Sequence, residues 1–505
     1  MTNLNNIKSL YFIGAGGIGM SNLIRYFLSK EKNVAGYDRT ESELTKQLNN
    51  EGAQIHYEDN INLIPEIYTD KENTLVVLTP AVPNDHSELN YFKNKGFEIM
   101  KRAQLLGEIT KTNRAICVAG THGKTTTSSM IAHLLKQSHV DCNAFLGGIL
   151  KNYNNNLLLS DKSDLTVIEA DEYDRSFHWL SPYMAVITSA DPDHLDIYGT
   201  EEAYRESFEH FTSLIRENGV LLIKEGVDIS PRLKEGIKLY TYSVRRSLRL
   251  RRAKNKALLC KDASQRLAFS NDVVRDAEQQ QSTPDNSANQ VPFRGFRGEN
   301  LKIENGEIFF DFVTPTETIK DVQLGVPVKI NVENAVAAMA IAWLNGVTAE
   351  ELKAGMKSFQ GAKRRFDFHL KTDKIVLIDD YAHHPEELSA SISSVKELYP
   401  NRKLTTIFQP HLYSRTKDFY KEFAKSLSLS DEIILLEIYP AREEPIEGIT
   451  SQLILDNMPE MQKKLCTKAT LPEVIKNGNY DVVLIAGAGD IELLVEPVKK
   501  LLVND

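Results

Sequence analysis

A short loop bounded by glycines carries the residues best suited to chemistry in this chain. An apolar run at residues 115–119 precedes it, a helical pattern follows it, and the loop itself reads Gly120-Thr121-His122-Gly123-Lys124-Thr125-Thr126. Backbone N–H groups at such a loop and helix start attract phosphates, the lysine reaches terminal phosphates, and a Thr hydroxyl ligates Mg²⁺. The loop is shorter than G-x-x-x-x-G-K-[ST], and an ordinary glycine turn with a surface lysine is the alternative. The flanking strand and helix favour a nucleoside triphosphate site.

A second glycine loop lies near the start of the chain. It follows an apolar run at residues 8–13, precedes a helical pattern at 21–28, and reads Gly14-Ala15-Gly16-Gly17-Ile18-Gly19. This G-x-G-x-x-G spacing lets a pyrophosphate approach a helix N-terminus, and Asp38 ends the next strand where a ribose-binding acid is expected. Taken alone, the loop suggests NAD or an ordinary strand–helix turn. Beyond the strand at 74–79 come Thr79 and Ala81, and then Arg102, which faces either a phosphate or solvent.

Two clusters of acidic residues follow short apolar strands in the middle of the chain. The first is Glu169-Ala170-Asp171-Glu172-Tyr173-Asp174, and the second is Asp191-Pro192-Asp193-His194-Leu195-Asp196. Carboxylates at strand ends beside a phosphate loop are expected Mg²⁺ ligands, whereas histidine is an unusual one. We therefore expect Thr125, Glu169 and, as a less usual ligand, His194 to hold a metal. Solvated acidic loops are the alternative.

The elements around these motifs indicate three consecutive α/β domains. The chain has 505 residues, of which 42% are hydrophobic, and short apolar strands at 374–378, 403–408, 432–436 and 481–485 alternate with helical patterns at 385–398 and 417–427. We expect a Rossmann-like sheet at 1–112, a P-loop-type ATPase domain at 113–360 and a Rossmann-like domain at 361–505. A last glycine turn at 487–489 lacks an accompanying Lys or Thr, which favours a structural turn over a third phosphate site.

The overall composition excludes several classes of protein. The formal net charge is −9, which argues against a general nucleic-acid binder. Four scattered cysteines without a C-x-x-C pair fit a reducing cytoplasm, and no apolar run approaches the ~20 residues that span a bilayer. Oligomeric state stays open between monomer and dimer.

Residues 246–298 interrupt this pattern as an apparent insertion. Seven of the twelve residues at 245–256 are basic, and residues 276–292 are polar and contain no aromatic residue. Such a composition buries too little apolar area to offset its ordering entropy, which predicts a disordered surface excursion from the central domain. The basic run suggests binding to an anionic partner or a membrane surface, and a solvated loop without function is the alternative.

The ordered motifs resemble those of the Mur ligases, ATP-dependent ligases of bacterial cell-wall precursor synthesis. The resemblance rests on G-A-G-G-I-G-M, G-T-H-G-K-T-T-T, E-A-D-E-Y-D-x-S-F and D-P-D-H-L-D, and covers nearly the whole chain except about residues 246–298. Motifs at 364–368, 379–385 and 408–416 are similar to those of the branch that adds the first amino acid. The resemblance implies that ATP activates the lactyl carboxylate of UDP-N-acetylmuramate as an acyl phosphate, which the amine of L-alanine attacks.

The resemblance also implies a role for individual residues. The first glycine loop, with Asp38, Thr79, Ala81 and Arg102, would hold the UDP-sugar rather than NAD. The second loop would hold ATP, Asn331 would contact adenine, Asp380 the ribose, and Arg365 the terminal phosphate. Lys124, Glu169, His194 and Arg365 would be catalytic, with Thr125, Glu169 and His194 as metal ligands. Tyr381, His383 and Arg415 would line the amino-acid site, and His383 is a candidate general base, although it also suits a structural helix cap.

Three positions depart from the family pattern, and two other functions remain open. Ile330 stands where a His is usual, Leu412 where a second basic residue is common, and Ser189 where Asn is common. A recycling ligase that attaches a tripeptide to the same sugar nucleotide would share both glycine loops. An ATP-binding scaffold without catalysis is a second alternative, against which the intact Lys124 and Arg365 count.

Overall fold

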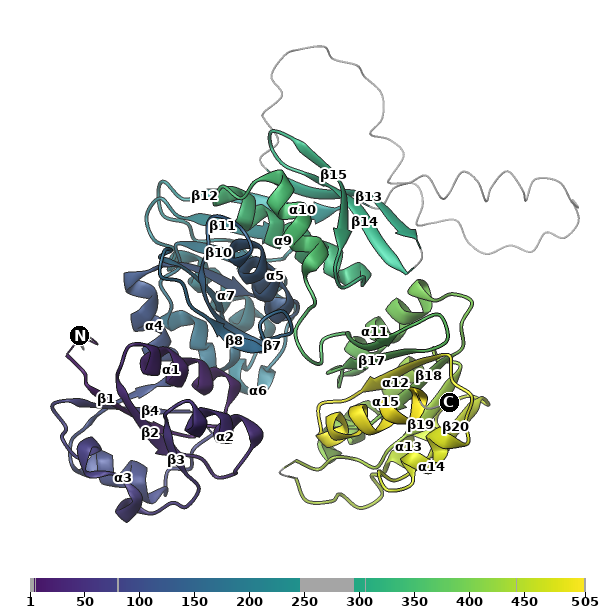
Figure 1. The fold of residues 1–505 in the computed structure, drawn as a ribbon, viewed down its shortest axis with the longest axis horizontal. Coiled ribbons are helices and arrows are strands. Elements are labelled where there is room, and N and C mark those ends of the chain that lie inside the picture. The colour runs from purple at the N-terminus through teal and green to yellow at the C-terminus, as the bar shows by residue number, and fades with distance from the viewer. Residues whose placement is uncertain are drawn as a thin grey trace, which may run out of the picture.

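The computed structural model describes residues 4, 6–79, 81–245, 295–304, 306–441 and 443–503. These residues form three sheets of five, ten and six strands (Figure 1). Each sheet lies within one of the three predicted ranges, and the α/β class with three domains is confirmed. Within the described residues, no helix is long and apolar enough to cross a membrane.

The first sheet is parallel throughout and places the first glycine loop at its centre. Its strand order is β3-β2-β1-β4-β5, so the chain reverses direction across the sheet between β1 and β4. Ligands of open α/β sheets bind at such a switch point. The elements are β1 (Ser9–Ile13), α1 (Ile18–Ser29), β2 (Asn33–Tyr37), α2 (Glu43–Asn50), β3 (Gln54–His56), η1 (Ile61–Leu63), η2 (Glu66–Tyr68), β4 (Thr74–Leu78), α3 (Ser87–Asn94), β5 (Glu98–Lys101) and α4 (Arg102–Thr112).

The central sheet has the order β15-β14-β13-β12-β11-β10-β6-β9-β7-β8. Its middle strands are parallel, whereas β14, β15 and β8 pair antiparallel with their neighbours. The elements are β6 (Arg114–Ala119), α5 (Lys124–Lys136), β7 (Asn143–Leu150), β8 (Asn155–Leu158), β9 (Leu165–Glu169), η3 (Tyr173–Trp179), β10 (Met184–Ile187), α6 (Leu195–Tyr198), α7 (Glu201–Ser213), β11 (Val220–Lys224), β12 (Lys238–Val244), β13 (Gly295–Glu304), β14 (Glu307–Val313), β15 (Thr318–Leu324), α9 (Lys329–Leu344) and α10 (Ala349–Ser358).

The predicted insertion ends earlier than the sequence suggested. Residues 246–294 lie outside the described part of the chain. Residues 295–298, which we expected to belong to the disordered excursion, instead form the start of β13 and pair in parallel with β12. Phe296 is fully buried there, so it has an apolar reason to stay in the sheet.

The third sheet has the order β16-β17-β21-β18-β19-β20, and only β16 among its described strands runs antiparallel to its neighbour. Figure 1 shows this domain beside the central one, with α11 and β17 on the side next to the central domain. The elements are β16 (Asp367–Lys371), β17 (Val376–Asp380), α11 (Pro385–Leu398), β18 (Leu404–Phe408), α12 (Tyr413–Leu427), β19 (Glu432–Leu435), α13 (Ser451–Asp456), β20 (Gln462–Leu465), α14 (Leu471–Lys476), β21 (Val482–Ala486), η4 (Asp490–Leu494) and α15 (Val495–Val503).

Candidate active site

The central glycine loop connects the buried strand β6 to helix α5, which begins at Lys124 itself. Gly123 caps the helix with a φ of +83°, in the left-handed region that favours glycine. A Cβ atom at Gly123 would also lie 2.8 Å from Oδ1 of Asn334. The first backbone N–H groups of α5 have no partner within the helix, so they are available to a phosphate.

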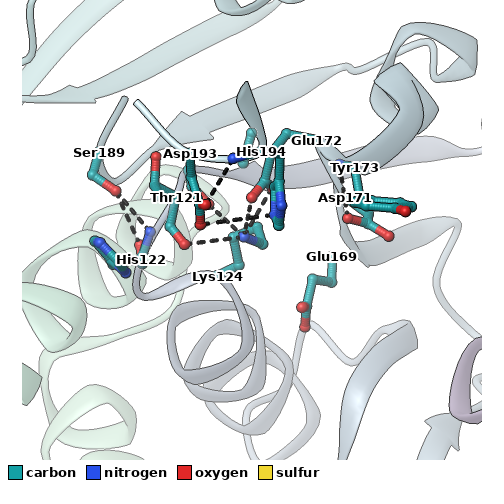
Figure 2. Close-up of polar contacts among 12 residues, drawn as sticks. Thr121, His122, Lys124, Glu169, Asp171, Glu172, Tyr173, Ser189, Asp193 and His194 are labelled. Carbon is teal, nitrogen blue, oxygen red and sulfur yellow. Dashed lines mark hydrogen bonds and ion pairs between the residues drawn. The ribbon is translucent and has the colours of Figure 1, made fainter. Parts of the chain in front are cut away.

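Lys124 lies folded against its own loop. Its Nζ donates to the carbonyl oxygens of Gly120 at 2.6 Å and Thr121 at 3.2 Å, and forms an ion pair with Glu172 at 2.8 Å (Figure 2). Glu172 is 2% exposed. Burial raises the pKa of Glu172, and the charge of Lys124 opposes that rise. The buried Glu172 carboxylate therefore holds the Lys124 ammonium group at the loop where a triphosphate is predicted to bind.

The other loop residues are fixed by the neighbouring strand ends. The backbone N–H of His122 donates to Oγ of Ser189 at 2.8 Å, and Oγ1 of Thr121 donates to the Asp191 carbonyl at 2.6 Å. Ser189 thus supplies a side-chain acceptor to the loop.

Glu169 lies on the opposite side of the helix start from Glu172. Its Oε1 accepts from the Thr125 hydroxyl at 2.9 Å, and its Oε2 accepts from the backbone N–H of Gly147 at 3.1 Å. Burial raises the pKa of Glu169, while the charges of Lys124 and Arg365 oppose the rise. Two oxygen donors of the type that Mg²⁺ prefers therefore stand together.

His194 is the N-cap residue before α6, on a separate loop, with a φ of +52°. Its ring makes an edge contact with Tyr173 at 5.2 Å, and its Nε2 lies 3.8 Å from Oδ2 of Asp193. In Figure 2 His194 and Glu169 lie apart, and no dashed line joins them. Among the described residues, no three His, Cys, Asp or Glu side chains gather into a group that could hold a metal.

The nucleotide loop opens into two adjoining cavities between the central and C-terminal domains. One, of about 440 Å³, is lined by Thr121–Thr126, Glu169, Asn331 and Arg365. The other, of about 150 Å³, is lined by Thr126, Asn331, Arg365 and Asp380. The residues predicted for phosphate, adenine and ribose thus line two cavities that share Thr126, Asn331 and Arg365. Ile330 lines both cavities and is 54% exposed, so it offers an apolar face rather than a hydrogen bond.

Arg365 is the cation shared by these groups. Its charge acts on Glu169, Asp380 and Glu387, and its guanidinium lies 5.3 Å from the centre of the Tyr381 ring. Burial raises the pKa of Asp380, and a hydrogen bond from Ser391 at 2.7 Å opposes the rise. The charge of Arg365 therefore acts both on Glu169, which is predicted for the metal, and on Asp380, which is predicted for the ribose.

The three fingerprint glycines of the first loop each face another predicted residue of that site. A Cβ atom at Gly14 would lie 2.4 Å from Thr79, one at Gly16 would lie 2.8 Å from Asp38, and one at Gly19 would lie 2.7 Å from Arg102. Oδ2 of Asp38 accepts from the backbone N–H of Gly16 at 2.6 Å. Asp38 therefore braces the glycine loop in this structure.

Arg102 links the first loop to the central domain. Its guanidinium donates to Oδ2 of Asp171 at 3.3 Å. Both residues line a cavity of about 430 Å³ that also includes Thr79 and Ala81, and a second cavity of about 270 Å³ that reaches from Gly19 to Glu169. Glu169 thus borders the space beside the first glycine loop as well as the nucleotide cavity.

The residues predicted to bind the amino acid lie beyond the carboxyl ends of β17 and β18, which flank β21 in the third sheet. The rings of Tyr381 and His383 are 5.2 Å apart, and that of His411 is 6.1 Å from His383. Arg415 lies with its guanidinium 3.4 Å from Nδ1 of His411. Burial lowers the pKa of Arg415, and the charges of Glu387 and of Asp193 from the central domain oppose this.

Comparison with known proteins agrees with this arrangement. Profiles described as "Mur ligase family, catalytic domain", "Mur ligase middle domain" and "Mur ligase, glutamate ligase domain" match residues 9–114, 118–274 and 364–489. UDP-N-acetylmuramate–L-alanine ligases of Parabacteroides distasonis and Porphyromonas gingivalis W83 are 61% and 54% identical to this chain. The alignments cover 99% of this chain and 98% of the first relative, and 98% of this chain and 99% of the second.

The chain belongs to the Mur ligase family. Among solved structures, the UDP-N-acetylmuramate-alanine ligase of Thermotoga maritima superposes with a TM-score of 0.74 at 25% identity, covering 98% of this chain and 99% of that one. A murein peptide ligase of Psychrobacter arcticus shares the fold, with a TM-score of 0.62 at 20% identity over 99% of each chain. The predicted membership in the Mur ligases is therefore confirmed.

Several residues of this Mur ligase site had no predicted role. Glu172 was visible only as one member of an acidic cluster, and its pairing with Lys124 comes from tertiary contact. Asn334 follows Asn331 by one helical turn, donates to it at 3.2 Å and accepts from Thr127 at 3.2 Å. Glu387 is the third residue of the helix predicted at 385–398. A Glu at this position commonly accepts a hydrogen bond from the backbone N–H of the residue that caps the helix, and this was the signal for its contact.

Proposed function

We propose that this Mur ligase joins L-alanine to the lactyl carboxylate of UDP-N-acetylmuramate, with hydrolysis of ATP, in peptidoglycan precursor synthesis. The names of relatives that are 54–61% identical over nearly the whole chain support this. The geometric observation that carries the proposal is that Glu169 borders both the cavity beside the first glycine loop and the nucleotide cavity. A carboxylate on a sugar nucleotide and a terminal phosphate would meet there.

The reaction needs activation because a carboxylate has oxide as its leaving group. ATP would transfer its terminal phosphoryl group to the lactyl carboxylate, and the amine of alanine would displace phosphate from the resulting acyl phosphate. Lys124 and Arg365 would neutralise the charge that develops on the transferred group. A positioned arginine in phosphoryl transfer is worth ~10³–10⁵ in rate, so Arg365→Ala should lower kcat by roughly 10³-fold or more.

The metal assignment rests on the donor atoms present. Thr125 and Glu169 supply oxygen ligands 2.9 Å apart, which suits Mg²⁺. We infer that these two residues hold the ion together with His194. When bound, Mg²⁺ would neutralise negative charge on the phosphate oxygens.

The residues that line the cavities indicate where adenine, ribose and the UDP diphosphate would bind. Asn331 and Asp380 would bind adenine and ribose, and the first glycine loop with Arg102 would bind the UDP diphosphate. Arg415 would bind the carboxylate of alanine, since a guanidinium pairs well with that group. Tyr381 and His383 would flank its amine, with His383 as the general base.

Phosphate release by the purified protein tests this proposal. With ATP, Mg²⁺ and UDP-N-acetylmuramate present, L-alanine should stimulate release, whereas the tripeptide L-Ala-γ-D-Glu-meso-diaminopimelate should not. Glycine and L-serine belong in the panel, because one methyl group in an apolar pocket discriminates by only ~1–3 kcal/mol. Stimulation by the tripeptide alone would replace this function with that of a recycling ligase, and no release with any amine would indicate an ATP-binding scaffold.

A further inference from the structure

Glu387 is a carboxylate at the centre of the amino-acid site for which the proposed function gives no role. It is the third residue of α11, and one oxygen, Oε2, accepts from the backbone N–H groups of His383 at 3.1 Å and His384 at 3.3 Å. The same oxygen lies 3.5 Å from Nδ1 of His383. Glu387 also lines both nucleotide cavities. It therefore touches the histidine and faces the place where substrates would meet.

The surroundings of His383 define which ring nitrogen is available as a base. Nδ1 lies 2.9 Å from the carbonyl oxygen of Tyr381. A carbonyl only accepts, so in the neutral imidazole Nδ1 carries the proton and Nε2 keeps its lone pair. Burial lowers the pKa of His383, which keeps the ring neutral near pH 7. A neutral imidazole with a free lone pair is suited to accept a proton from an ammonium group.

The charges that face His383 come from several elements. Arg365, before β16, and Arg415, on α12, both disfavour a second proton on the ring, whereas Glu387 favours it. Tyr381 contributes its carbonyl oxygen, and the His411 ring packs edge-on. An imidazolium at this position would be disfavoured by the charges of two guanidinium groups, so the nearby carboxylate is the group that makes proton uptake feasible.

We propose that Glu387 is a positioning residue for amide formation that acts through His383. The Tyr381 carbonyl holds Nδ1–H of the ring, and the charge of Glu387 beside it stabilises the imidazolium that forms when Nε2 takes a proton from the ammonium group of alanine. The freed nitrogen lone pair then forms the C–N bond, the C–O bond to the phosphoryl oxygen breaks, and the departing phosphate takes the proton released by the new amide nitrogen. This role rests on the proposed function, since it names the base that the alanine reaction needs.

Glu387→Gln is the decisive variant, because glutamine keeps an acceptor oxygen for the backbone N–H groups but loses the charge. We expect kcat to fall by roughly tenfold or more, since general-base catalysis contributes ~10²–10⁴-fold. The acidic limb of kcat/KM for alanine should move to lower pH by roughly one unit, because loss of a nearby opposite charge makes the imidazolium less stable. A titration of the ¹⁵N-labelled His383 ring by NMR should show the same shift.

Two further variants separate this role from a structural one. Glu351→Gln removes a similar contact at the start of α10, where Glu351 accepts from the Thr348 N–H at 3.0 Å, and it should leave the pH profile unchanged. Glu387→Asp keeps the charge and should retain the wild-type acidic limb with a reduced kcat. An unshifted His383 titration in Glu387→Gln would overturn the proposal, as would a shifted titration with an unshifted kinetic limb. If wild-type protein showed no alanine-dependent phosphate release, the proposed function itself would fail, while the NMR titration would still report on the Glu387–His383 contact.

Discussion

At the scale of single residues, the nucleotide loop carries a buried charge pair that the reaction must rearrange. Lys124 contacts Glu172 through an ion pair of 2.8 Å, and Glu172 is almost completely buried. A triphosphate would draw the ammonium group away from this partner. The pair satisfies two groups that would otherwise be buried alone.

Replacing Lys124 tests this interpretation by its effect on stability. Lys124→Ala should lower the free energy of unfolding by about 3–5 kcal/mol at pH 8, because it leaves a buried carboxylate without a partner. Burial raises the pKa of Glu172 above its unfolded value, so the folded variant takes up a proton more readily than the unfolded chain. Its stability should therefore be greater at pH 5 and should fall as the pH rises through the folded-state pKa.

Urea denaturation at pH 5 and pH 8 gives the required comparison. The double variant Lys124→Ala/Glu172→Gln should recover most of the loss at pH 8, since the neutral amide costs less to bury than an unpaired carboxylate. An equal loss at both pH values would show that the pair does not carry the effect.

At the scale of elements, both glycine loops join a buried parallel strand to a helix N-terminus. In the first loop, the space for a side chain at Gly16 is taken by Asp38, which accepts from the Gly16 N–H at 2.6 Å. The neighbouring Gly17 is different, because a Cβ atom there would meet only Met20, at 3.9 Å. The loop thus requires glycine at one position and tolerates a methyl group at the next.

This contrast predicts a matched pair of variants. Gly16→Ala should raise KM for UDP-N-acetylmuramate at least about tenfold, a loss of ~1.4 kcal/mol in binding, because Asp38 and the loop must move apart. KM for ATP should change little, since the nucleotide loop lies on another sheet. Gly17→Ala should leave both constants near wild type. Equal effects of the two variants in steady-state kinetics would contradict the geometric argument.

At the scale of the whole molecule, the proposed reaction site is assembled from all three domains. Helix α1 is joined to the central domain by hydrogen bonds from Asn22 to the Leu146 carbonyl and from Asn156 to the Ile18 carbonyl, both at 2.9 Å. The nucleotide cavities instead lie between central residues such as Asn331 and C-terminal residues such as Arg365. Ligands that fill them would draw the C-terminal domain towards the other two.

Small-angle scattering measures this closure. A non-hydrolysable ATP analogue together with UDP-N-acetylmuramate should reduce the radius of gyration of the protein. Arg365→Ala should weaken the reduction, since the charge of Arg365 acts on groups of both domains. Unchanged dimensions with saturating ligands would show that the domains are already closed.

The sequence predicted local structure well where the signal lies within one element. The helix expected at 385–398 is α11, residue for residue. The strand expected at 374–378 is instead Val376–Asp380. Asp379 and Asp380 continue the pairing with β21, and a search for apolar residues does not predict acidic residues in a strand. The helix expected to begin at 417 begins four residues earlier, at Tyr413. The residue before it, Leu412, is the N-cap and has a φ of +75°.

The two glycine loops that precede helices, the order of three α/β domains and the resemblance to Mur ligases could all be predicted from the sequence. These depend on short stretches of chain, where glycine spacing and strand–helix alternation are set by neighbouring residues. The packing of separate elements was needed to show that Glu172 pairs with Lys124, that the charge of Arg365 acts on Glu169 and Asp380, and that Glu387 lies beside His383. Ion pairs and buried carboxylates depend on distance and on exclusion of water, and both are set when separate elements pack together.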